Sequence, residues 1–133
     1  MSLVLEMILP DRRIEIRDLI SVVFQSGEGE VGILGGHAPL ICEVSAGTLC
    51  AVQDPHRRQR FVTGQGLARI DKDRISLLLM DLIEEDQIDE AAARRQVQRA
   101  RAEAALHPAD GDDYEQQVHF AEAQLALVRN GTG

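Results

Sequence analysis

Hydrophobic and polar residues alternate in steps of two along residues 3–82, which is the pattern of strands with one buried face. Turn-forming clusters such as Asp54-Pro55-His56 interrupt the alternation at short intervals. Short strands spaced roughly 8–12 residues apart are typical of an antiparallel sandwich or barrel. We expect strands over residues 3–9, 13–16, 20–24, 40–44, 48–52, 59–63, 67–70 and 74–80.

The pattern becomes helical after Asp86. Residues 89–106 contain no glycine or proline and consist mainly of Ala, Arg, Gln and Glu, which favour helix. Asp86 or Asp89 can cap the start of this helix, and Pro108 and Gly111 should end it.

A second helix is expected to begin at Asp112 or Asp113, either of which can cap it, and to end at Gly131. Its apolar residues recur every three or four positions, so that one stripe holds Tyr114, Val118, Ala121, Leu125 and Val128. The connection 107–111 is short enough for two antiparallel helices. The expected architecture is therefore β + α, with an N-terminal antiparallel β-sandwich over residues 1–85 and a C-terminal αα-hairpin over residues 86–133.

The expected hairpin is only weakly apolar. Its first helix offers mainly Ile88, Val97, Leu106 and several alanines for packing, so little apolar area can be buried. Two readings stay open, a hairpin fixed on the sandwich and a hairpin that shifts between arrangements when partners compete for it.

Residues 27–40 stand apart because five glycines, His37 and Pro39 fall within fourteen positions. Such a stretch needs tight turns, and we expect a glycine-rich loop that joins two strands and presents a docking surface. Gly27, Gly29 and Gly32 match G-x-G-x-x-G, but a phosphate site needs a helix after the glycines. No helix can start here, so a nucleotide fingerprint is rejected.

Composition narrows the possible partners. A length of 133 residues with 44% hydrophobic residues suits one compact domain, or a small domain with an appendage. The net charge of −8 argues against nucleic acid and against direct docking on anionic lipid. The sequence has no apolar run that could span a bilayer and no signal peptide. We therefore expect a soluble protein with protein partners, which reaches a membrane only through them.

The two cysteines, Cys42 and Cys50, are symmetric about Ala46. If residues 45–47 turn a hairpin, the two thiols could lie opposite each other on one face. In a reducing cytosol we expect free thiols that act as small core residues.

No arrangement of residues suggests catalysis. His37, His56, His107 and His119 lack metal-ligand spacing, and no serine lies in a nucleophile-elbow setting. We expect no catalytic residue, no metal site and no cofactor.

Four segments together resemble the epsilon subunit of bacterial F-type ATP synthase. That family typically shows G-x-x-G-E-[LV]-G-I-x-P-G-H-A-P-L, and residues 29–40 read GEVGILGGHAPL. The segments Gly47-Thr48-Leu49, Gln87-Ile88-Asp89-Glu90-Ala91 and Gly111-Asp112-Asp113-Tyr114 also resemble family segments. The resemblance covers essentially the whole chain.

The resemblance implies a non-catalytic rotor subunit that couples ion-driven rotation of the c-ring to ATP synthesis or hydrolysis. The sandwich would bind the gamma subunit and the c-ring, and the hairpin would reach the beta and alpha subunits. Glu28, Gly29 and Glu30 would face the c-ring, whereas His37, Ala38 and Pro39 would lie on the gamma side. The expected location is peripheral, on the cytoplasmic face of the bacterial inner membrane, through the complex.

Departures from the family pattern concern the hairpin and the loop. The loop proline is replaced by Gly35, which loosens the turn. Members that bind ATP show [IL]-D-x-x-R-A and a second R-A. Ile88, Asp89 and Arg99 match this pattern, but Ala92 replaces the first arginine. Because alanine cannot pair with phosphate, we expect weak or absent ATP binding.

The second helix departs as well. Inhibitory epsilon subunits use basic residues near the C-terminus, whereas residues 112–133 hold four acidic residues and one basic residue. We therefore expect weak inhibition of ATP hydrolysis, because an acidic partner would repel this helix.

Two other classes compete with the rotor reading. One is a free-standing β-sandwich module that binds a small ligand, against which the 3% aromatic content counts. The other is an enzyme with a cryptic site. The motif in residues 29–40 favours the rotor subunit over both.

Overall fold

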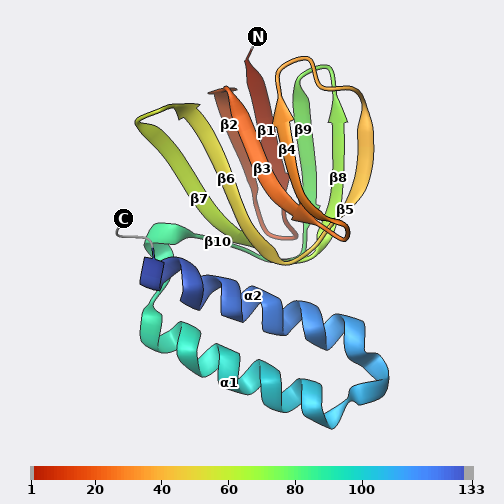
Figure 1. Ribbon diagram of the computed structural model, residues 1–133, viewed down its shortest axis with the longest axis vertical. Helices are drawn as coiled ribbons and strands as arrows, with labels where there is room; N and C mark the ends of the chain where they lie inside the picture. Colours follow the sequence, from red (N-terminus) through yellow and green to blue (C-terminus); the bar gives the residue numbers. More distant parts are fainter. Residues whose placement is uncertain (1, 131–133) are drawn as a thin grey trace.

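A computed structural model describes residues 2–130, in which a curled β-sheet is followed by two packed helices (Figure 1). The strands are β1 (Leu3–Ile8), β2 (Arg13–Leu19), β3 (Ser21–Ser26), β4 (Gly29–Leu34), β5 (Leu40–Val44), β6 (Gly47–Asp54), β7 (Arg57–Thr63), β8 (Gly66–Asp71), β9 (Arg74–Leu79) and β10 (Leu82–Glu84). The helices are α1 (Glu90–Leu106) and α2 (Gly111–Asn130), each preceded by a 3-10 turn, η1 (Glu85–Gln87) and η2 (Pro108–Asp110). The predicted sandwich and αα-hairpin are confirmed.

The strands follow the order β10-β7-β6-β3-β5-β8-β9-β1-β2, with β4 on the other side of β3. The sheet folds over on itself, so that β3 and β4 pass in front of β1 and β9 (Figure 1). Neighbouring strands are antiparallel except for β1 and β9, which run parallel from Val4 opposite Arg74 to Ile8 opposite Leu78. The first strand of the chain therefore joins the sheet between its second and its ninth strand.

Alternating side chains fill the space between the two layers. Phe24, Phe61, Leu5, Leu49 and Leu77 are almost fully buried there. The intervening positions on the same strands face outward, as period-two patterning requires. This core is built from residues between Leu3 and Leu82, so the hairpin contributes nothing to it.

The prediction of a loop over residues 27–40 is wrong for the middle of this range. Residues 29–34 form β4, which pairs with β3 from Ser26 opposite Gly29 to Ser21 opposite Leu34. Six cross-strand pairs override the low strand propensity of Gly29 and Gly32. Only two short turns remain, one before β4 and one after it.

The hairpin around Ala46 that the sequence allowed does not form. β5 pairs with β8, where Cys42 lies opposite Ala68, and β6 pairs with β3 and β7. Ser45 and Ala46 carry the chain past β3 instead of turning it back. Cys42 and Cys50 are both free thiols, as predicted, but they do not face each other.

The helices follow the prediction with changes at their ends. The Asp89 carboxylate caps α1 by accepting the Ala92 N–H at 2.8 Å. α1 ends at Leu106, before Pro108, whereas α2 begins at Gly111, so Asp112 and Asp113 lie inside its first turn instead of capping it. The expected end at Gly131 lies outside the described residues.

The predicted stripe on α2 is only partly the buried face. Ala121 is fully buried, whereas Tyr114, Val118, Leu125 and Val128 are half-buried. The other buried residues of α2 are Gln124 and Leu127.

α2 lies against one end of the sandwich. A small cluster of Val62, Ile88, Ala93 and Leu127 joins the two parts. The Ala46 N–H also donates to Gln116 Oε1 at 2.7 Å. Among the residues that the structure describes, neither helix is long and apolar enough to cross a membrane.

Candidate interaction surfaces

The β3–β4 connection carries Glu28 in its turn, followed by Gly29 and Glu30 at the start of β4, on the end of the sandwich nearer the helices (Figure 1). The Ser26 hydroxyl shapes it by donating to the Gly29 carbonyl at 2.8 Å and accepting the Glu28 N–H at 3.2 Å. Gly29 has a φ of +120°, which disfavours any residue with a side chain. Both carboxylates are therefore exposed on a tightly held turn.

The turn after β4 carries His37, Ala38 and Pro39 on the far end of the sandwich (Figure 1). The His37 N–H donates to the Leu34 carbonyl at 3.2 Å. The Gly36 N–H donates to Asp73 Oδ1 at 2.7 Å, which ties this turn to the β8–β9 connection.

The two predicted site groups are therefore separated. At about 3.3 Å per residue, a six-residue strand places its two turns roughly 20 Å apart. The structure does not bring Glu30 and His37 together, and one partner surface would have to be large to reach both.

An exposed apolar patch was missed by sequence reasoning. It consists of Leu67 on β8, Leu78 on β9, Met80 and the adjoining Ile8 on β1, and we call it the β8–β9 patch. Leu67 and Leu78 lie directly opposite each other, each 52% exposed, and Met80 is 63% exposed. A shallow apolar groove of about 410 Å³ runs along it. The unbroken run of residues 77–80 is the sequence signal that could have revealed it.

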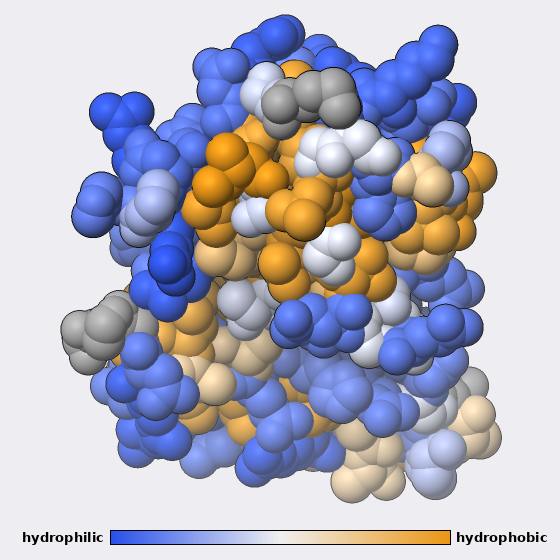
Figure 2. Space-filling model, turned by 45° about the horizontal axis from the view of Figure 1, so that its top comes forward, coloured by the Kyte–Doolittle hydropathy of each residue, from blue (hydrophilic) through white to orange (hydrophobic). Residues whose placement is uncertain are grey.

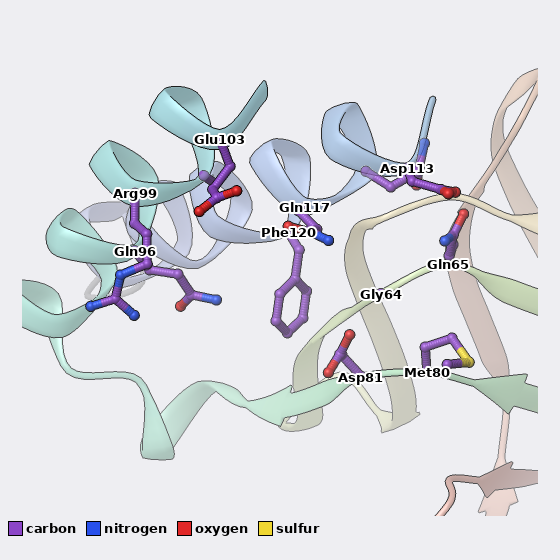
Figure 3. Close-up of a pocket in the computed structure, with 12 residues that line it drawn as sticks. Gly64, Gln65, Met80, Asp81, Gln96, Arg99, Glu103, Asp113, Gln117 and Phe120 are labelled. Atoms are coloured by element: carbon purple, nitrogen blue, oxygen red, sulfur yellow. The ribbon is translucent and has the colours of Figure 1, made fainter. Parts of the chain in front are cut away.

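A wider cavity of about 620 Å³ lies between the hairpin and the sandwich. Figure 3 shows Phe120 pointing from α2 toward the segments that hold Gly64 and Asp81. Asp81, Glu103 and Asp113 line it against a single guanidinium, that of Arg99. The excess of carboxylates makes the cavity unfavourable for a polyphosphate.

The three residues of the vestigial ATP motif are not brought together. Ile88 is buried in the cluster that docks the hairpin, and Asp89 is occupied as the helix cap. Arg99 lies ten residues further along α1 and lines the cavity, so about 15 Å of helix separates it from Asp89.

Two titratable groups have shifted pKa values. The pKa of Glu6 is lowered, mainly by the hydrogen bond from Arg13 and also by Arg74, whose guanidinium lies 3.1 Å away. Burial raises the pKa of the Cys42 thiol, and the nearby Glu28 carboxylate raises it further. Within residues 2–130 no three His, Cys, Asp or Glu side chains are grouped so that they could hold a metal ion.

Comparison with known proteins gives consistent matches. The family model described as "ATP synthase, Delta/Epsilon chain, beta-sandwich domain" matches residues 2–85. The ATP synthase epsilon chain of Granulibacter bethesdensis is 32% identical, over 80% of this chain and 77% of that protein. The epsilon chain of Trichodesmium erythraeum is 30% identical, over 97% of this chain and 92% of that protein.

Solved structures share the fold. A chain in the cryo-EM structure of the Euglena gracilis mitochondrial ATP synthase, described as OSCP/F1/c-ring, superposes with a TM-score of 0.78 at 18% identity. That match covers 96% of this chain and 81% of the other. A chain from the central stalk/c-ring of the Tetrahymena thermophila enzyme superposes with a TM-score of 0.56 at 11% identity, over 65% of this chain and 69% of the other.

Proposed function

Because the chain belongs to the epsilon-chain family of ATP synthases and is a non-catalytic subunit of the central stalk, we propose that it couples ion-driven c-ring rotation to ATP synthesis and hydrolysis. Residues 1–85 bind the gamma subunit and the c-ring, and residues 86–133 form a regulatory hairpin that reaches the beta and alpha subunits. The chain is held on the cytoplasmic face of the bacterial inner membrane through the complex, without insertion. Because the chain belongs to this family, we set aside the alternative function of a free-standing ligand-binding module.

The separation of the two turns by β4 is the observation that supports this use of the surfaces. Glu28, Gly29 and Glu30 project from one end of the sandwich, where they face the polar loops of the c-ring. His37, Ala38 and Pro39 lie at the other end and lead directly into β5. β4, which is paired along its whole length with β3, links the two contacts, and this suits a part that transmits torque because paired strands resist bending.

The β8–β9 patch extends the proposed gamma contact. β5 pairs with β8, and β8 pairs with β9, so the His37 turn and the patch belong to the same layer of the sandwich. Exposed leucines and a methionine of this kind mark protein interfaces. We therefore place gamma along the outer side of this layer.

Binding of the purified chain to its cognate gamma subunit tests the proposal. Leu78→Asp should weaken binding at least about tenfold, because a carboxylate would be buried in the interface. His37→Ala should weaken it as well. Leu106→Asp is the matched control, since Leu106 is exposed at the end of α1, and it should leave the affinity unchanged. If Leu78→Asp and the wild type bind gamma with equal affinity, gamma does not contact this surface.

We also propose that the isolated chain does not sense ATP. Ala92 supplies no phosphate partner, Asp89 is engaged as a cap, and Arg99 is outnumbered by carboxylates. Millimolar ATP should leave the melting temperature unchanged, whereas a site with micromolar affinity would raise it measurably. A clear rise with ATP, absent in Arg99→Ala, would contradict this part of the proposal.

A further inference from the structure

The outer side of the other sandwich layer also carries apolar residues. The buried positions Val22, Ile33 and Leu49 fix the inward direction on β3, β4 and β6. Their neighbours face outward, and we call the following set the front face: Val23, Gly32, Leu34, Cys50 and Val52. Figure 2 shows hydrophobic residues gathered on the side of the sandwich that faces the reader, above the largely hydrophilic hairpin.

The strand register gives the front face a defined centre. Val23 lies opposite Cys50 on one side and opposite Gly32 on the other. Leu34, which is 65% exposed, and Val52 both lie opposite Ser21, one step along the strands. None of these central residues is charged. Arg60 on β7 lies opposite Cys50 and borders them, but it is already paired with Glu85 at 3.0 Å, so a partner that covers the centre buries no charge without a counter-charge.

Opposite charges flank the centre on a diagonal. Arg58 on β7 lies opposite Val52, and Val52 follows Cys50 by two residues on β6. Glu30 on β4 lies opposite Gln25, two residues from Val23 in the other direction. Both side chains are exposed, and neither takes part in an ion pair within the described residues. The midpoint of this diagonal falls between Val23 and Cys50.

We propose that the front face binds a second copy of this chain in a two-fold symmetric dimer. A two-fold axis lying in the plane of the face, through its centre and across the diagonal, brings Arg58 of each copy opposite Glu30 of the other. One operation thus forms two ion pairs and covers the apolar centre on both copies. An isologous interface requires this self-complementarity, whereas an axis along the diagonal would set like charges against each other.

The proposed dimer belongs to the unassembled chain. Gamma is placed on the opposite layer, so it leaves the front face free. Glu30, however, is also placed toward the c-ring, and one carboxylate cannot serve both contacts. Assembly into the complex would therefore release the dimer, which would protect the front face from non-specific association before that point.

Sedimentation equilibrium of the isolated full-length chain tests the dimer without any other subunit. The wild type should show a monomer–dimer equilibrium, and Arg58→Glu or Glu30→Arg should weaken it about tenfold, because each reversal creates two like-charge contacts. The double variant Arg58→Glu/Glu30→Arg should restore dimerisation. Arg69→Glu, an exposed arginine on the opposite layer, is the control and should have no effect.

The native cysteines report the geometry independently. A short bismaleimide should join two copies through Cys50, close to the axis, so that Cys50→Ser abolishes the product and Cys42→Ser does not. A monomer at all concentrations would overturn the proposal. So would a dimer insensitive to both charge reversals but broken by Leu78→Asp, which would move the contact to the β8–β9 patch. Because gamma binding is measured separately, either proposal can fail without the other.

Discussion

At the scale of single residues, Glu6 shows how charges are arranged on the outer side of the sheet. Glu6 on β1 lies directly opposite Glu15 on β2, a like-charge pair that would be destabilising alone. Arg13 bonds to Glu6, while Arg74 lies 3.1 Å from Glu6 and 3.3 Å from Glu15. The two arginines convert a repulsion into a network that covers the buried carboxylate.

The Glu6 network predicts a pH-dependent stability. Because the folded-state pKa of Glu6 is below its ordinary value of 4.5, ionised Glu6 stabilises the fold above that pH. This contribution disappears as the pH falls from 4.5 through the lowered pKa. Glu6→Gln should therefore lower the urea midpoint at pH 7 and approach the wild type in acid. Glu43→Gln, an exposed carboxylate on β5, should show no such convergence.

Gly66 is required by a close approach of two backbones. A Cβ placed on it would lie 1.9 Å from the Leu78 carbonyl oxygen, which belongs to the paired strand and cannot move aside. Gly66→Ala should therefore reduce the free energy of unfolding by about 2–4 kcal/mol.

Gly32 provides the matched test of this steric cause. A Cβ at Gly32 would meet only Val23, at an ordinary 4.0 Å. Gly32→Ala should change the free energy of unfolding by less than about 1 kcal/mol. Equal losses in chemical denaturation of the two variants would rule out the backbone contact as the cause.

At the scale of elements, the first turn of α1 depends on one carboxylate. Asp89→Ala removes the acceptor of the Ala92 N–H and should cost about 1 kcal/mol. Hydrogen exchange of the first α1 amides should accelerate, while β-strand amides stay protected. Asp86→Ala is the control, because Asp86 lies in η1 and caps no helix. Faster exchange in both variants would point to a general loosening instead of a lost cap.

Element types were largely predictable because each buried face leaves a period in the sequence. The alternation around Val22 and Phe24 predicts β3, and the glycine-free run after Asp89 predicts α1. β4 was not predictable in the same way, since Gly29 and Gly32 lower its own propensity and its pairing with β3 supplies the stability. Cross-strand partners leave little local signal, which is why the sequence could not decide whether Cys42 and Cys50 lie opposite each other.

The candidate surfaces show the same limit. Glu28 and His37 could be singled out because turns demand particular residues, but their separation depended on the unrecognised strand between them. The β8–β9 patch and the front face arise only when outward residues of different strands are set side by side. Leu78 and Val23 each look ordinary in the sequence.

At the scale of the whole molecule, the sandwich does not depend on the hairpin for its core, whereas the hairpin depends on the sandwich for its position. The sandwich core is complete without the helices, whereas the hairpin docks through a small cluster that includes Val62 and Leu127 and through the hydrogen bond from Ala46 to Gln116. A chain ending after residue 85 should therefore still fold and still bind gamma.

The same truncation tests regulation in the assembled enzyme. α2 carries Asp112, Asp113, Glu115 and Glu122 against Arg129 alone, so an acidic partner would repel it. Removing residues 86–133 should leave the ATP hydrolysis rate within about twofold of the intact complex. A several-fold rise would show that the hairpin inhibits strongly despite its charge.

The parallel pairing of β1 with β9 has a consequence for the timing of synthesis. β1 leaves the ribosome first, but one of its two neighbours follows about 70 residues later, roughly 4–14 seconds at common elongation rates. During that interval Leu3, Leu5 and Met7 can pair only with β2. One edge of β1 therefore stays unpaired during this interval, with its apolar side chains exposed. A chaperone would find the largest exposed apolar surface on the nascent chain at this stage.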